Sequence, residues 1–330
     1  MLAFAGEDAE PRAACLNKFW ARLRRVWVYE QSEESLWTVT FSPCGRTLAT
    51  GGTDNKAKLY DVASGNLRRE IVRTSSVDAV EFSPDGAWIA VGGRDSNAAL
   101  YDVATFSLQL EFQSHNWVSS LAFSPDSASL AMEGRSEREI CLYYVETGLR
   151  RSYDCGEILY SLAISPDGSA LASAGSGVLL QSIADLRQRR VLCPEHRPWF
   201  TAVAFSHDSS TLVTGGWDKN ITLFDVATGA LQRAIPQADI IQTLTFSPDA
   251  IIVGDFRGKI SVYELNESGS CNFEKKRFQL DRGAHISHVA SSPGGRIFAA
   301  VSGIVHSTRV ALFNSKTGDL LRRGAVPSNP

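Results

Sequence analysis

The chain has 330 residues, of which 44% are hydrophobic and 21% are charged, and its formal net charge at pH 7 is −3. These values are ordinary for a protein with a buried core, and the small negative charge excludes a chain that coats nucleic acid through surplus lysine and arginine. No window approaches the ~20 apolar residues that a membrane-spanning helix needs. We therefore expect neither a nucleic acid partner nor a transmembrane segment.

Residues 1–33 form an N-terminal extension ahead of the repeated part of the chain. Its apolar residues recur at helical spacing, at Leu16, Phe19, Trp20, Leu23 and Trp27. This pattern is typical of a helix with one apolar stripe, which would pack on the rest of the protein, contact a partner through residues 16–29, or lie on a membrane surface. Alternatively, the segment around Val28 is extended and adds a strand to the last repeat.

From residue 34 onward an apolar-Ser-Pro element recurs seven times. Its copies begin at residues 41, 82, 123, 164, 205, 246 and 291, so that five intervals are 41 residues and the last is 45. The fifth copy has histidine in place of proline. A fixed period of this length is the sequence signature of repeated supersecondary units.

The second copy illustrates the pattern within one repeat. Residues 80–82, 88–91, 98–101 and 108–112 are short runs rich in strand-forming residues. Turn sequences separate them, beginning with Pro84-Asp85-Gly86, in which proline fixes φ and glycine allows a positive φ. Each repeat is therefore predicted to be an antiparallel meander of four strands.

One meander alone exposes two apolar faces. Stacking the meanders around an axis buries both faces of each, and closing the ring leaves only short outer edges. The sequence therefore predicts an all-β fold, in which residues 34–330 form a seven-bladed β-propeller with four-stranded antiparallel blades.

The repeats resemble the WD-repeat β-propeller family. In that family the third strand of each repeat ends in Trp-Asp. The corresponding pairs here are Tyr60-Asp61, Tyr101-Asp102, Tyr143-Tyr144, Gln181-Ser182, Phe224-Asp225, Tyr263-Glu264 and Phe313-Asn314. An aromatic residue survives in six of the seven copies, so the chain resembles a divergent member. The resemblance implies a non-catalytic scaffold or adaptor for protein–protein interaction, as part of a larger complex.

The family also has a buried hydrogen-bonded set of histidine, serine or threonine, aspartate and tryptophan. The fifth copy comes nearest to it, with His196, Thr214 and Asp218. The first copy keeps Thr50 and Asp54, and the second keeps Asp95. Buried aspartates need hydrogen bonds, so we expect these residues to hold strands together rather than to catalyse a reaction.

In this family the turns before the first strand and between the second and third strands open at the same end of the ring. Large side chains gather in these turns, at Trp37, Arg94, Trp117, Tyr160, Trp199 and Trp217. Tryptophan, tyrosine and arginine dominate the energetics of protein interfaces. We therefore predict these six residues as candidates for partner binding.

No catalytic motif appears in the sequence. The segment 254–260 is one residue short of a phosphate-binding loop and lies in a predicted hairpin. His285 and His288 are three residues apart, which places them on opposite faces of a strand, and no cysteine or carboxylate completes a metal site. We expect no enzyme activity, no metal and no cofactor.

Two alternative functions would leave other features in the sequence. A propeller-type enzyme would need a polar site at the axial channel. A substrate receptor for a cullin-type ubiquitin ligase would carry arginine two residues after the aspartate of Trp-Asp, where this chain has Ala63, Ala104 and Ala227.

The remaining features concern the compartment and the ends of the repeated region. Six cysteines are scattered without a pairing pattern, which favours a reducing compartment, the cytoplasm or the nucleus. The polar stretch 266–283 is predicted to be an inserted surface loop, either solvated or in contact with a partner. Residues 320–323 are strand-like and compete with the N-terminal extension for the closing position of the last blade.

Overall fold

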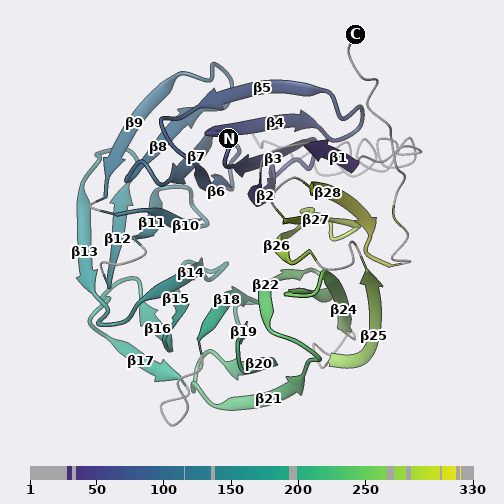
Figure 1. Cartoon of the computed structure of the whole chain (residues 1–330). Coiled ribbons are helices and arrows are strands. Elements are labelled where there is room, and N and C mark those ends of the chain that lie inside the picture. The colour runs from purple at the N-terminus through teal and green to yellow at the C-terminus, as the bar shows by residue number, and fades with distance from the viewer. Residues whose placement is uncertain are drawn as a thin grey trace, which may run out of the picture.

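The computed structural model describes residues 28–31, 35–114, 116–134, 138–192, 199–265, 271–279, 284–304, 307–316 and 320. In these residues 28 strands and no helix form seven four-stranded sheets, which follow one another around a central opening (Figure 1). The predicted all-β, seven-bladed propeller is therefore confirmed.

Each blade runs outward from an inner strand to an outer strand. The inner strands are β2 (Leu36–Phe41), β6 (Val77–Phe82), β10 (Val118–Phe123), β14 (Leu159–Ile164), β18 (Phe200–Phe205), β22 (Ile241–Ser247) and β26 (Ile286–Ser291). The second strands are β3 (Thr47–Gly52), β7 (Trp88–Gly93), β11 (Ser129–Gly134), β15 (Ala170–Gly175), β19 (Thr211–Gly216), β23 (Ala250–Asp255) and β27 (Ile297–Ile304). The third strands are β4 (Lys56–Asp61), β8 (Asn97–Asp102), β12 (Glu139–Tyr144), β16 (Val178–Ser182), β20 (Asn220–Asp225), β24 (Lys259–Leu265) and β28 (Ser307–Asn314). The outer strands are β5 (Leu67–Val72), β9 (Leu108–Gln113), β13 (Arg150–Asp154), β17 (Arg189–Leu192), β21 (Leu231–Pro236), β25 (Cys271–Gln279) and β1 (Val28–Gln31).

The repeated Ser-Pro element forms the turn between the first two strands of a blade. In the second blade the Ser83 hydroxyl donates to Asp85 Oδ1 at 2.5 Å and accepts the Trp88 amide at 2.9 Å. Gly86 completes the turn with a φ of +76°, which side chains disfavour. The serine therefore fixes the turn by bonding to both of its sides.

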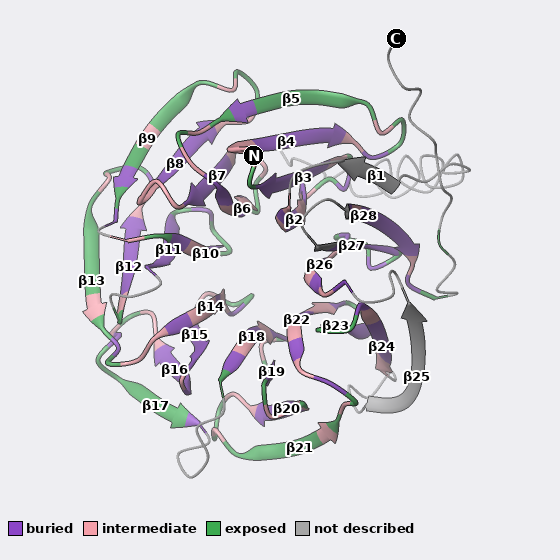
Figure 2. Ribbon diagram, viewed as in Figure 1, coloured by how far each residue is buried: buried purple, intermediate pink, exposed green. Residues whose placement is uncertain are grey.

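Burial follows the position of a strand within its blade. The second and third strands are buried along most of their length, whereas the outer strands β5, β9, β13, β17 and β21 mostly face solvent (Figure 2). In the described residues one apolar cluster lies between each pair of neighbouring blades. One of these joins Val39 and Phe41 of the first blade to Val301 and Leu312 of the last, so the ring is sealed by a core like those elsewhere.

The last blade is completed by the N-terminal strand. β1 pairs antiparallel with β28, with Val28 opposite Ala311 and Gln31 opposite Thr308. Leu320 makes an isolated bridge to Phe313 on the same strand. Both ends of the repeated region therefore meet β28, and β1 forms its outer neighbour. The helix expected over residues 16–27 lies outside the described residues.

The polar stretch 266–283 contains a strand that the sequence did not indicate. Residues Cys271–Gln279 form β25, which pairs with β24 as the outer strand of the sixth blade. The prediction of a surface loop was wrong for this part, because the outer edge strand of a sheet tolerates the charged residues that suggested a loop.

Candidate functional site

One end of the ring carries the segments that lead into the inner strands and the turns that follow the second strands. Backbone amides of the turns donate to carbonyls of the leading segments, in the pairs Thr53–Ser35, Arg94–Ser76, Ser176–Ile158, Trp217–Trp199 and Phe256–Ile240. We call this end the loop face. All six predicted partner-binding candidates lie in or next to its segments.

Five planar side chains from five neighbouring blades form a stacked row on the loop face. The guanidinium of Arg94 lies 5.0 Å from the ring centroid of Trp117 and 5.8 Å from that of Trp37. Trp37 in turn stacks on His285 at 6.5 Å between centroids, and His285 stacks on Phe256 at 5.8 Å. The row therefore runs from Phe256 in the sixth blade, through the seventh, first and second blades, to Trp117 in the third.

A carboxylate fixes the arginine of this row. Asp78, in the inner strand β6, accepts a hydrogen bond from Arg94 Nε at 3.1 Å and another from the Ser76 hydroxyl at 2.7 Å. The ion pair sets the plane of the guanidinium, and a fixed plane is what stacking between two indoles requires.

The other three candidates form a second group over the fourth and fifth blades. Tyr160 and Trp199 have ring centroids 5.5 Å apart, and the Trp217 amide donates to the Trp199 carbonyl at 2.8 Å. Trp217 is 59% exposed and Trp199 39%, compared with 41% for Trp117 in the stacked row. Tryptophan surface of this extent is costly to leave in water, because the indole is large and mostly apolar.

Sequence reasoning missed three members of the loop face. Phe256, 51% exposed, follows β23 in the turn where the fifth blade has Trp217. His285 precedes β26, as Trp117 precedes β10, and Asp78 holds Arg94. Phe256 and His285 could have been found by aligning the seven copies by turn rather than by residue type. No sequence pattern indicates that Asp78 is the partner of Arg94.

A second carboxylate on the loop face is enclosed by two cations. Asp239 is 7% exposed, forms an ion pair with Arg257, and lies 3.8 Å from Lys219 Nζ. Both of these cations belong to turns that follow second strands, in the fifth and sixth blades. Asp78 and Asp239 are therefore both neutralised by cations of the same face.

The inner strands enclose an axial cavity of about 750 Å³, to which all seven blades contribute. Side chains of three inner strands accept backbone amides of the neighbouring blade across its wall. Ser120 accepts the Leu162 amide at 2.9 Å, Thr243 accepts the Val289 amide at 3.2 Å, and Ser161 accepts the Val203 amide at 3.4 Å. The wall is therefore tied together by hydrogen bonds as well as by packing.

His288 makes the same kind of link where the last blade meets the first. Its Nδ1 lies 3.0 Å from the Val39 carbonyl oxygen, to which the protonated nitrogen donates. Burial lowers the pKa of His288 to about 4, against the opposing effect of that hydrogen bond. The imidazole is therefore neutral at physiological pH, and its hydrogen bond joins the last blade to the first in the cavity wall.

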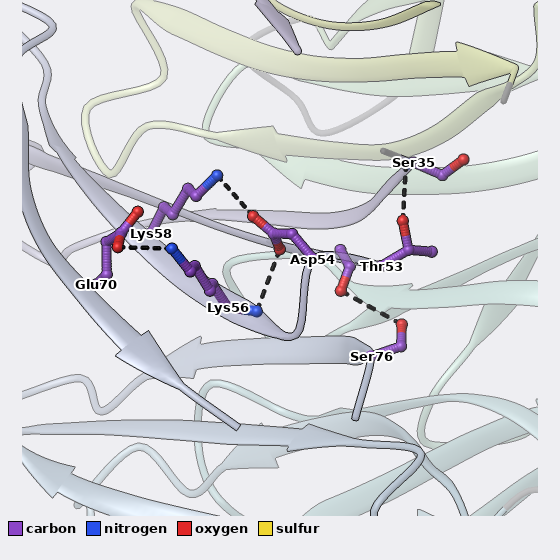
Figure 3. A network of polar contacts seen from close by, with 8 residues as sticks. Ser35, Thr53, Asp54, Lys56, Lys58, Glu70 and Ser76 are labelled. Carbon is purple, nitrogen blue, oxygen red and sulfur yellow. Dashed lines mark hydrogen bonds and ion pairs between the residues drawn. The ribbon is translucent and has the colours of Figure 1, made fainter. Parts of the chain in front are cut away.

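The aspartates of the family's buried set have partners that are different from those in the family pattern. Asp54 accepts the Lys56 amide at 3.1 Å and pairs with Lys58 Nζ at 2.6 Å, while Lys56 Nζ pairs with Glu70 at 2.9 Å (Figure 3). In the second blade Asp95 pairs with Arg73 at 2.9 Å. Cations thus take the place of histidine beside both acids.

The remaining members of the set form few contacts in the described residues. Asp218 accepts the Asn220 amide at 3.2 Å. The hydroxyls of Thr50 and Thr214 are buried and have no hydrogen-bond partner in this part of the chain. His196 lies outside the described residues, so the set of the fifth blade is described only in part.

The described segments hold no group of three or more His, Cys, Asp or Glu side chains that could bind a metal ion. They also hold no helix whose length and apolarity would suit a membrane span.

The fold and the repeats can be compared with known proteins. The crystal structure of RRP9 WD40 repeats is similar, with a TM-score of 0.76 and 14% sequence identity over 87% of this chain and 96% of that chain. At this identity the likeness shows the fold alone. Residues 35–308 match the family described as the IFT122 first beta-propeller. The match spans most of the seven blades, and the chain therefore belongs to the IFT122 first β-propeller family, with a WD40-type fold.

Proposed function

We propose that this protein is a non-catalytic scaffold that binds partner proteins through its loop face. The observation that supports this most directly is the pair of aromatic groups on that face, with Trp117, Trp199, Trp217 and Phe256 each exposing between 39% and 59% of its surface. Aromatic and arginine side chains that are rigidly held and partly exposed are the residue types that anchor protein interfaces.

The side chains of the loop face are held rigidly. The Arg94 guanidinium is sandwiched between indoles and held by Asp78, and Trp217 is bonded through its backbone to the segment of Trp199. Side chains that are already ordered lose little conformational entropy when a partner binds. The face therefore suits a partner with a matching, preformed surface.

Membership of the IFT122 first β-propeller family supports a role as a subunit of a protein complex. The thiols of Cys44 and Cys155 form no disulfide in the described residues, which favours a reducing compartment such as the cytoplasm.

The outer strands offer a competing surface, because Leu67, Leu108 and Leu231 are also exposed there. Single exposed leucines are ordinary on an edge strand, so we place the partner on the loop face.

The test compares proteins that co-purify with wild type and with two variants, measured by quantitative mass spectrometry. Trp199→Ala combined with Trp217→Ala removes the second aromatic group, and Leu231→Ala, on the outer strand of the same blade, is the matched control with 60% exposure. We expect specific partners to fall at least tenfold with the double variant and to persist with the control. Retention by the double variant would show that this face is not used.

A further inference from the structure

One carboxylate lines the axial cavity where the other blades have small neutral residues. Glu81 lies in β6, between Val80 and Phe82, which pack in the core toward the first blade. Because side chains alternate along a strand, Glu81 projects from the opposite face, and it lines the cavity. The equivalent residues in the other inner strands are Thr40, Ala122, Ala163, Ala204, Thr245 and Ala290.

The described residues supply no countercharge to Glu81. No hydrogen bond or ion pair joins its carboxyl to any of them, whereas Asp78 and Arg94, which also line the cavity, pair with each other. His285 and His288 line it too, and burial lowers the pKa of both. Burial also raises the pKa of Glu81 to about 8.

The space around the carboxyl is large enough to hold a ligand. The cavity measures about 750 Å³, within the ~300–1,000 Å³ typical of small-molecule sites. Ala122 of the third blade and Ala163 of the fourth also line it, and Trp37, Tyr160 and Trp217 line it on the side of the loop face. A ligand entering there passes aromatic surface before it meets the acid.

We propose that the axial cavity binds one organic cation, the side chain of an arginine or a lysine from a partner protein, with Glu81 as its countercharge. The cation would neutralise a carboxylate whose ionised form is disfavoured by burial. Its aliphatic stem would lie along the alanines of the wall, as the stems of basic side chains do on apolar surface.

The chemistry of the cavity favours an organic cation over a metal ion. Calcium takes six to eight oxygen ligands, and magnesium demands a near-octahedral set, whereas the described lining offers one unpaired carboxylate. A guanidinium, by contrast, pairs with a single carboxylate through two parallel hydrogen bonds. That a partner chain delivers the cation rests on the proposed function; the cation site itself does not.

The experiment measures binding of N-acetyl-L-argininamide to the full chain by NMR titration at pH 7 and pH 9. N-acetyl-L-norleucinamide is the neutral control, and agmatine is a free cation without peptide groups. We expect saturable binding of the blocked arginine, no saturable binding of the neutral control, and at least a tenfold loss of arginine affinity in Glu81→Gln. Glu81→Ala, which installs the residue of four other blades, serves as the second variant if the first fails to fold.

The pH gives an independent readout. Only the ionised carboxyl pairs with the probe, so affinity should rise about tenfold from pH 7 to pH 9 in wild type. The variants should show no such rise. The guanidinium keeps its charge over this range, and the histidines that line the cavity stay neutral because their pKa values are lowered.

Equal affinity in wild type and in the Glu81 variants, or no saturable binding to folded wild type, would overturn the proposal. Agmatine binding more than tenfold tighter than blocked arginine would overturn the partner as the source of the cation. The partner test with Trp199 and Trp217 is separate. Loss of partner capture by the double variant, together with no arginine binding, refutes only the cation site. Retained capture, together with arginine binding that depends on Glu81, refutes only the loop face.

Discussion

Arg73 and Asp95 form an ion pair that crosses from the first blade to the second, with only 8% and 6% of their side chains exposed. Arg73 Nε donates to Asp95 Oδ2 at 2.9 Å, and its Nη1 lies 3.4 Å from the hydroxyl of Tyr101, the residue in the tryptophan position of the family pattern. The arginine therefore does in this blade what histidine does in the family's buried set, and adds a positive charge.

Replacing this arginine should destabilise the ring. Arg73→Met leaves Asp95 as a buried charge without its cation, which costs about 3–5 kcal/mol of the free energy of unfolding. Urea denaturation of wild type, Arg73→Met, Asp95→Asn and the double variant measures the coupling between the two residues. We expect the double variant to lose clearly less than the sum of the single variants; simple additivity would show that the pair contributes no coupling.

A methyl group at Gly216 should disturb the second aromatic group. A Cβ at this position would lie 2.1 Å from the Trp199 carbonyl oxygen and 2.7 Å from the Phe200 Cα, both atoms of the backbone. Gly216→Ala should therefore cost about 1–3 kcal/mol and shift the tryptophan fluorescence. Gly177→Ala is the matched control, because no atom lies within 4 Å of its Cβ. Equal melting temperatures for the two variants would contradict the close approach.

The stability of the protein should fall in acid through His288. Its pKa is about 4 in the folded state, below the 6.5 of an exposed histidine, so the unfolded chain binds more protons between these values. Stability is then complete above pH 6.5 and decreases as pH falls toward 4, by roughly 2–3 kcal/mol. His288→Ser, which copies Ser120 and Ser161, should remove this part of the pH dependence. Urea midpoints at pH 7, 5.5 and 4.5 would test it, and parallel curves for the two proteins would contradict it.

Glu81 should produce the opposite pH dependence. Burial raises its pKa to about 8 from 4.5, so the folded state holds a proton that the unfolded chain releases. Stability decreases as pH rises from 4.5 to 8, and the loss is complete above pH 8, with an upper limit of about 5 kcal/mol that water in the cavity reduces. Glu81→Gln should therefore be more stable than wild type at pH 9 and similar at pH 4.5. Calorimetry at both pH values measures the difference in stability between the two proteins. If Glu81→Gln were less stable than wild type at pH 9, the raised pKa of Glu81 would be refuted.

The parts of the structure that follow from local sequence could be predicted. The 41-residue period sets the number of blades, and the Ser-Pro-Asp-Gly sequence specifies its turn through bonds such as Ser83 to Asp85, which need only neighbouring residues. The inner strands are predictable because they pack against the neighbouring blades on both sides, so apolar residues occupy both of their faces.

What the sequence could not supply depends on contacts between distant residues. Arg73 meets Asp95 across two blades, and Asp78 orients Arg94 from another strand. β25 is a strand where the sequence predicts a loop, because its charged residues 274–277 interrupt the apolar alternation that marks an outer strand such as β9. The closing strand depends on the pairing of residues near the two ends of the chain, which no local pattern determines.

That pairing has a consequence for how the protein is made. β1 leaves the ribosome before the other described strands, and its partner β28 emerges after six whole blades. At ~5–20 residues per second, the delay is on the order of tens of seconds. During translation the first strand must therefore wait with its backbone unpaired by β28, so that aggregation or capture by a chaperone has its longest opportunity at this seam of the nascent chain.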